Sequence, residues 1–171
     1  MNKNPSIDIN SESNMPRYVG AIDIGTNSTH LLVTAVDPIL STFNIEITEK
    51  ATTRLGEVDQ ETGELTSTAM ARVLETLKRF KELAASHQVE QLVVAATSAV
   101  REAPNGDLFL DQVKNQLDLN VDLISGTEEA RLIYLGVLSG MQFGENPHLL
   151  IDIGGGSTEL ILADSKDARA L

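Results

Sequence analysis

The chain has 171 residues, of which 25 are acidic and 13 basic, giving a formal net charge of −12 at neutral pH. This charge argues against simple electrostatic binding to nucleic acid or to an anionic membrane. The absence of cysteine excludes a disulfide framework, thiol catalysis and Cys-based zinc sites. No stretch approaches the ~18 apolar residues of a membrane span, and the N-terminus lacks the apolar core of a signal peptide. These features predict a cytoplasmic protein.

The first part of the chain predicts a polar tail followed by three strands. Residues 1–16 are rich in Asn and Ser and lack periodicity, which is typical of a flexible tail. Tyr18–Ile24 and Thr29–Val36 are apolar runs that predict two strands joined by a tight turn at residues 25–28. In Phe43–Thr53, apolar and polar residues alternate around Ile45 and Ile47, which predicts a third strand with one solvated face.

The middle of the chain predicts helices separated by short strands. Thr66 is a plausible N-cap for a first helix, and Asp107–Leu117 predicts a second. The apolar stretch Gln91–Ala96 predicts a strand buried on both faces. The apolar residues of the first helix recur at helical spacing, and they are Met70, Val73, Leu74, Leu77, Phe80, Leu83 and Ala84.

The last third of the chain repeats this alternation. Val121–Ile124 predicts a strand, and Thr127 is expected to cap a third helix that runs to about Gly140. Leu149–Ile153 and Thr158–Ala163 predict a second pair of strands joined by a turn. Strands that alternate with helices indicate the α/β class.

The two strand–turn–strand segments are similar in sequence. When residues 23–33 (DIGTNSTHLLV) are aligned with residues 152–162 (DIGGGSTELIL), six of the 11 positions are identical. Chance similarity between two hairpins is the alternative explanation. Because the match has one register and no gap, we favour a duplicated lobe in which each copy opens with the same hairpin.

The residues of both turns suit a phosphate group. Gly25 and Gly154 permit positive φ, and Gly155 and Gly156 remove side chains where a ligand would approach. Successive turn amides can converge on a phosphate oxygen, whereas an ordinary glycine-containing hairpin is the simpler interpretation of each turn alone. The predicted phosphate-binding positions of the two turns are Gly25, Thr26, Asn27, Ser28, Gly154, Gly155, Gly156 and Ser157.

An aspartate precedes each turn. Asp23 and Asp152 are placed where carboxylates can hold a hydrated Mg²⁺ beside a bound phosphate. The repeat also contains one asymmetry, since Glu159 occupies the position that His30 holds in the first copy. A strand histidine such as His30 is more often packed or solvent-facing than a ligand. The asymmetry predicts that the metal or the attacking water lies nearer to the second hairpin.

Five collinear motifs between residues 18 and 163 resemble those of the exopolyphosphatase/guanosine pentaphosphate phosphatase (Ppx/GppA) family, a branch of the actin/sugar-kinase/heat-shock ATPase superfamily. Two are the phosphate hairpins, and three lie between them. The motifs are Asp23–Ser28, Arg54–Glu57, Ala96–Arg101, Ile124–Ile133 and Asp152–Glu159.

The resemblance implies a ribonuclease-H-like lobe, with a mixed sheet and flanking helices, over residues 17–141. It also implies the first hairpin of a second similar lobe over residues 147–171, across a cleft. The implied activity is release of terminal orthophosphate from inorganic polyphosphate, with guanosine pentaphosphate as the alternative substrate. The implied roles are a base or water-positioning carboxylate at Glu129, a phosphate ligand at Arg101, and a divalent-cation or water site at Asp152 and Glu159.

The residues themselves leave some of these roles open. Glu128 and Glu129 are also explained as first-turn partners of a helix dipole, which would favour the charged form of Glu129 and make it a weak base. Arg101 follows an apolar strand, where α/β folds place ligand groups, but it is equally explained as a surface arginine. Arg54, in a loop, is a weaker candidate.

Two alternative functions, and the length of the chain, also bear on what the protein is expected to do. A sugar kinase or ATPase is disfavoured by residues 125–131 (SGTEEAR), whereas a non-catalytic phosphate-binding or regulatory module stays open. The chain ends soon after Ala163, so we expect an N-terminal piece of a longer protein, inactive alone, whose basic track for polyphosphate lies further along. The apolar face of residues 149–163 predicts either a homodimer or packing back on the first lobe.

Overall fold

The computed structural model describes residues 16–170 except 38, 41, 145 and 165. Nearly all of the predicted tail, residues 1–15, lies outside the described part. The elements form two sheets, with the five-stranded sheet in the order β3-β2-β1-β4-β5. Its strands are β1 (Arg17–Ile24), β2 (Thr29–Asp37), β3 (Thr42–Ala51), β4 (Gln91–Ala96) and β5 (Asp122–Leu123).

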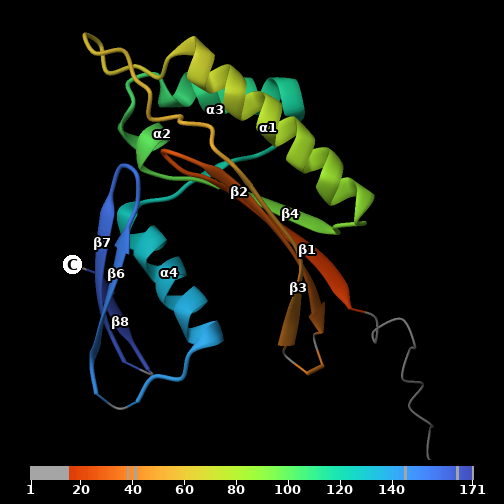
Figure 1. The fold of residues 1–171 in the computed structure, drawn as a ribbon, viewed down its shortest axis with the longest axis vertical. Coiled ribbons are helices and arrows are strands. Elements are labelled where there is room, and N and C mark those ends of the chain that lie inside the picture. The colour runs from red at the N-terminus through yellow and green to blue at the C-terminus, as the bar shows by residue number, and fades with distance from the viewer. Residues whose placement is uncertain (1–15, 38, 41, 145, 165, 171) are drawn as a thin grey trace, which may run out of the picture.

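The first sheet is mixed, which confirms the predicted α/β class with flanking helices. β1, β2 and β3 pair antiparallel, while β1–β4 and β4–β5 pair parallel. Helices α1 (Ser67–Ser86) and α3 (Gly106–Leu117) lie together over one face of this sheet (Figure 1). A short helix, α2 (Ser98–Glu102), follows β4 almost directly.

Helix α1 forms as the sequence predicts. The Thr66 hydroxyl accepts a hydrogen bond from the backbone N–H of Ala69 at 3.2 Å, so it satisfies one of the free donors of the first turn. The predicted apolar stripe faces the sheet, and Phe80 has no exposed surface. Five stripe residues are buried, together with Ala69, and they are Met70, Val73, Leu77, Phe80 and Ala84.

Two expectations about the first sheet are wrong, for related reasons. In β4, Val94 is buried while Val93 is 40% exposed, because α1 and α3 cover only one face of the sheet. In β3, a register irregularity opposite Val33 and Thr34 places Ile45 on the uncovered face, although Ile47 packs against the core. An added residue in one strand reverses which face the following side chains occupy.

The second sheet contains β6 (His148–Ile153), β7 (Thr158–Ala163) and β8 (Ala168–Ala170), and β8 was not predicted. Helix α4 (Gly126–Gly140) packs on it through Ala130 and Tyr134, which contact the cluster of Ile161 and Ala163 (Figure 1). The boundary predicted between residues 141 and 147 stays a prediction, and this packing favours a boundary before α4. The cap of α4 is Ser125, not Thr127, because the Ser125 hydroxyl accepts from the N–H of Glu128.

The face of the second sheet opposite α4 is apolar and exposed. Its side chains alternate with the buried ones, as expected for a strand pair with one covered face. They are Leu149, Ile151, Ile153, Leu160 and Leu162. Pairing of this face in a homodimer stays a prediction. Within the described residues, no helix has both the length and the apolar character that a membrane crossing requires.

Candidate active site

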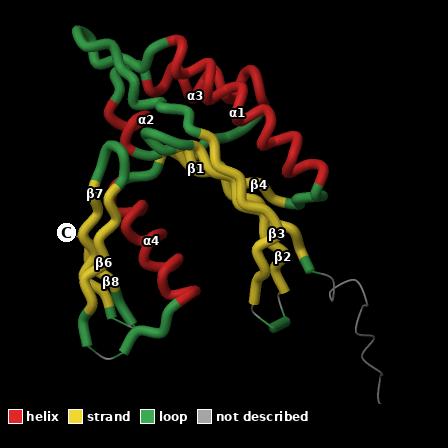
Figure 2. Tube along the Cα trace, viewed as in Figure 1, coloured by secondary structure: helices red, strands yellow, loops and turns green. Residues whose placement is uncertain are grey.

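A cleft of about 460 Å³ opens where the turns of the two hairpins meet. The loop that joins β6 and β7 reaches from the second sheet toward α2 and the end of β1 (Figure 2). Except for Gly156 and Arg101, every predicted site residue lines this cleft. These residues are Asp23, Gly25, Thr26, Asn27, Ser28, Glu129, Asp152, Gly154, Gly155, Ser157 and Glu159.

Each hairpin turn is closed by its first glycine. The N–H of Gly25 donates to the carbonyl of Ser28 at 3.0 Å, and the N–H of Gly154 donates to the carbonyl of Ser157 at 3.0 Å. Neither glycine has positive φ, so the turns do not use this conformational freedom. A Cβ on Gly25 would lie 3.0 Å from the Ser28 carbonyl oxygen, which shows that turn tightness requires the glycine. Since the two N–H groups are engaged, amides later in each turn are the ones available to an anion.

The first turn is braced by the loop that follows β3. The carbonyl of Asn27 accepts hydrogen bonds from the N–H groups of Thr53 and Arg54, at 3.1 and 2.9 Å. The carbonyl of Thr26 accepts from the N–H of Gly56 at 2.9 Å. With their carbonyls engaged on the loop side, Thr26 and Asn27 make no backbone hydrogen bond through their N–H groups within the described residues.

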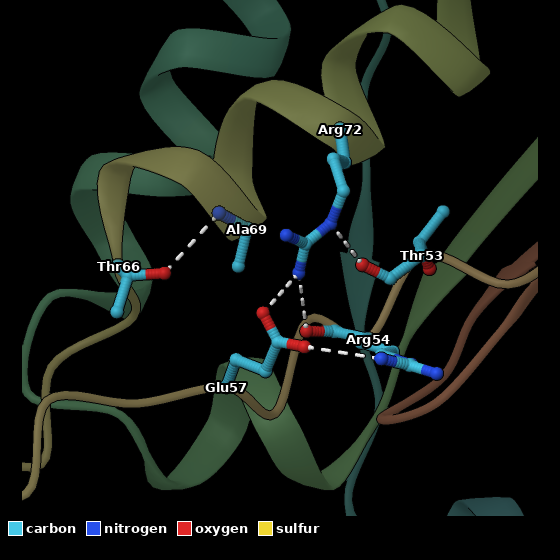
Figure 3. A network of polar contacts seen from close by, with 6 residues as sticks. All are labelled: Thr53, Arg54, Glu57, Thr66, Ala69 and Arg72. Atoms are coloured by element: carbon cyan, nitrogen blue, oxygen red, sulfur yellow. Dashed lines mark hydrogen bonds and ion pairs between the residues drawn. The ribbon is translucent and has the colours of Figure 1, made fainter.

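Arg72 on α1 fastens this brace to the helix, as Figure 3 shows. Its guanidinium donates to the carbonyl oxygens of Thr53 and Arg54, at 2.9 and 3.2 Å, and to the carboxylate of Glu57 at 2.6 Å. Arg54 also lies 3.9 Å from Glu57, and its own side chain is mostly exposed. The first hairpin is therefore positioned by helix α1, whose apolar face is buried, through one arginine.

The two turns interlock through glycines. A Cβ on Gly155 would lie 2.6 Å from the side-chain amide nitrogen of Asn27, and a Cβ on Gly156 would lie 2.6 Å from the hydroxyls of Thr26 and Ser98. The hydroxyls of Thr26 and Ser98 are hydrogen bonded to each other at 3.0 Å. The sequence interpretation assigned this empty space to a ligand, whereas in the structure the first hairpin fills it. Gly156 consequently lines a neighbouring cavity of about 360 Å³.

Replacing Gly156 with Ala is expected to separate the turns and to weaken phosphate binding about tenfold, because the added methyl group displaces the Thr26–Ser98 hydrogen bond. Titration of the purified chain with inorganic phosphate measures this effect. Gly136→Ala is the control, since nothing lies within 4 Å of a Cβ at that position on α4. Equal affinities of the two variants would contradict the interlocking role.

Glu129 faces the cleft and forms an ion pair with Arg101. One guanidinium nitrogen of Arg101 lies 3.3 Å from the Glu129 carboxylate and donates to the carbonyl of Ile124 at 2.7 Å. Burial raises the pKa of the Glu129 carboxyl, and the nearby Glu159 carboxylate raises it further, whereas Arg101 lowers it. The expectation that the helix terminus keeps Glu129 a weak base is therefore wrong, because desolvation outweighs the opposing effects.

Glu128 differs from Glu129 in its ion-pair partner and in the direction of its pKa shift. Its carboxylate accepts two hydrogen bonds from Arg131, each 2.8 Å long, on the exposed side of α4. The hydrogen bond from Arg131 lowers the pKa of Glu128. Glu128 is thus engaged away from the cleft, which favours Glu129 as the functional member of the pair.

Carboxylates gather around the cleft. Burial raises the pKa of Asp23 even though the residue keeps solvent contact, and the charge on Asp152 adds to the rise against the effect of His30. Glu159 is 8% exposed. No group of three or more acidic or histidine side chains in the described residues is close enough to form a metal site by itself. The predicted set of Asp23, Asp152 and Glu159 therefore stays a prediction.

Sequence reasoning missed four polar residues that line the cleft. They are His30, Lys50, Thr97 and Ser98. The hairpin register pairs His30 with Asp23, and the imidazole Nε2 lies 2.8 Å from the Ser28 hydroxyl, so the tight turn alone could have indicated His30. Lys50 gave no such signal, because the register irregularity of β3 hides its alignment with His30.

The mixed sheet and the paired hairpins around an acidic cleft define a two-part α/β protein with a site between its parts. The chain matches the Ppx/GppA phosphatase family over residues 32–171 and belongs to this family. It is 37% identical over 159 residues to a guanosine-5'-triphosphate,3'-diphosphate pyrophosphatase of Aliivibrio fischeri (strain MJ11), covering 93% of this chain and 31% of that protein. It is 34% identical over 148 residues to exopolyphosphatase 1 of Mycobacterium leprae, covering 83% and 42%.

Solved structures resemble the fold closely. An exopolyphosphatase from Cytophaga hutchinsonii superimposes with a TM-score of 0.84 at 33% identity, over 91% of this chain and 50% of that chain. An Aquifex aeolicus member of the Ppx/GppA family gives a TM-score of 0.79 at 30% identity, over 91% and 51%. The chain thus spans about a third of the length of the first curated relative and about half of these solved chains.

Proposed function

We propose that the cleft binds the terminal phosphate of inorganic polyphosphate and forms part of a site that hydrolyses its outermost phosphoanhydride bond. The observation that carries this proposal is the convergence of both repeated hairpins and Glu129 on one cleft. Turn amides and the hydroxyls of Ser28 and Ser157 would hold the phosphate oxygens, as in an anion nest. The names of the solved and curated exopolyphosphatase relatives support the substrate class.

The carboxylate of Glu129 would orient the attacking water and accept its proton. Phosphoryl transfer depends mainly on positioning and charge neutralisation, so a carboxylate base with a raised pKa is adequate. Arg101, which does not line the cleft, would hold Glu129 in place through the 3.3 Å ion pair. Its predicted phosphate contact stays a proposal.

A divalent cation such as Mg²⁺ fits the donor chemistry of the cleft. Asp23, Asp152 and Glu159 would supply oxygen ligands. Burial and, to a smaller extent, the charge on Asp152 raise the pKa of Asp23, and a cation would relieve this repulsion. Mg²⁺ usually keeps several waters and binds through one or two carboxylates plus substrate phosphates, so it does not require a closed set of protein ligands. When bound, the ion would neutralise phosphate charge.

Guanosine pentaphosphate is the second candidate substrate. The observation that favours it is the 37% identity with a relative named for guanosine-5'-triphosphate,3'-diphosphate. Both candidates present a terminal phosphoanhydride, so the hairpins and Glu129 would act on either. A non-catalytic phosphate-binding module is the alternative outside the enzymes.

Phosphate release from polyphosphate and from guanosine pentaphosphate, measured with the full natural protein that carries these residues, tests the proposal. We expect Mg²⁺-dependent release from polyphosphate, and little or none from the 171-residue chain alone. Release from guanosine pentaphosphate only would select the second candidate. Tight phosphate binding without release from either substrate would leave the non-catalytic module.

A further inference from the structure

One row of side chains continues the cleft beyond the first hairpin. The strand register pairs Asp23 of β1 with His30 of β2, and His30 with Lys50 of β3. All three residues line the cleft. Neighbouring strands are about 4.8 Å apart, so the backbone of Lys50 lies about 10 Å from that of Asp23. This distance exceeds the width of one phosphate group, so the row leads from the hairpin turn to a separate position.

Lys50 supplies a positive charge to this row and is not ion-paired with any described acidic group. Its side chain is exposed, and it makes no ion pair within the described part of the chain. By contrast, Arg101 is paired with Glu129 and Arg72 with Glu57. Among the described residues that line the cleft, Lys50 is the only lysine or arginine.

The two hairpins also differ in charge at equivalent places. His30 in the first hairpin corresponds to Glu159 in the second, and each lies across the strand pair from its aspartate. An anionic chain that extends from the turns would therefore meet Glu159 on one side, and His30 followed by Lys50 on the other. Repulsion from Glu159 and attraction to Lys50 both direct the anionic chain toward β3.

Resting on the proposed function, we propose that Lys50 binds an inner phosphate of a linear phosphate chain whose terminal phosphate lies between the hairpins. The lysine ammonium would donate charge-assisted hydrogen bonds to that inner phosphate. His30 is engaged with the Ser28 hydroxyl and so positions a group of the terminal subsite instead. Lys50 consequently sets the direction of the chain and distinguishes a condensed phosphate from a single one.

The test compares orthophosphate with tripolyphosphate as ligands of the 171-residue chain, by calorimetric titration in the presence of Mg²⁺. Lys50→Gln is expected to weaken tripolyphosphate binding about tenfold and orthophosphate binding less than about twofold. Lys50→Arg, which keeps the charge, is expected to retain most of the tripolyphosphate affinity. Lys78→Gln removes the same charge from an exposed site on α1 and serves as the matched control.

The outcomes separate this proposal from the broader one. Equal loss of both ligands in Lys50→Gln, no loss of either, or an equal effect of Lys78→Gln would overturn the role of Lys50, as would failure of the wild-type chain to bind tripolyphosphate. If Lys50→Gln acts on tripolyphosphate alone but the full natural protein releases no phosphate, the inner subsite stands and the hydrolytic function fails. Because Lys50 is exposed, the variant is expected to fold.

Discussion

Replacing Glu129 with Gln in the full natural protein is expected to lower kcat about 10³-fold while KM changes less than about threefold. The amide has nearly the same shape and can still accept a hydrogen bond from Arg101, but it cannot accept a proton from water. Phosphate release from polyphosphate under saturating substrate measures the effect. Glu128→Gln is the control, because Glu128 is bonded to Arg131 outside the cleft. Unchanged turnover in Glu129→Gln would remove the residue from the mechanism.

The pH dependence follows from the raised pKa of Glu129. The base must be ionised, so kcat/KM is expected to rise with pH through the elevated pKa and then level off. The Glu159 carboxylate raises the Glu129 pKa, so Glu159→Gln is expected to move this rise to lower pH, even though its kcat falls. A rise that moves to higher pH, or does not move, would contradict the coupling of the two carboxylates.

Replacing Gly106 with Ala is expected to lower the free energy of unfolding by about 3 kcal/mol and the thermal midpoint by about 10 °C. A Cβ at this position would lie 2.2 Å from the carbonyl oxygen of Val100, a backbone atom that cannot rotate away. Gly106 begins α3 and bonds to the carbonyl of Ala103, so the clash falls at the junction of α2 and α3. Differential scanning calorimetry of the purified chain gives the measurement.

The same substitution is expected to disturb the cleft, because α2 carries both Ser98 and Arg101. Gly136→Ala is the matched control. Nothing lies within 4 Å of a Cβ there, and Ala is the better helix former, so a small gain in stability is expected. A similar midpoint for the two variants would show that the α2–α3 junction adjusts without cost.

Local patterns predicted much of the fold and of the candidate site. Helix α1 and the two hairpins follow from apolar periodicity and turn residues, which short segments contain. Contacts between segments that are distant in sequence could not be predicted from these patterns. The exposure of Val93 depends on which face the helices cover, and the role of Gly156 depends on its contact with Thr26. Lys50 and the raised pKa of Glu129 likewise depend on neighbours distant in sequence.

The Arg101–Glu129 ion pair has a consequence for the integrity of the site. Arg101 follows β4 in the first sheet, whereas Glu129 lies on α4, which packs in the second hydrophobic cluster. The ion pair therefore connects two separately packed units. The pair would hold the proposed base, Glu129, at the cleft only while the two units stay packed together. Correct packing of the two units and correct placement of the Glu129 carboxylate therefore depend on each other.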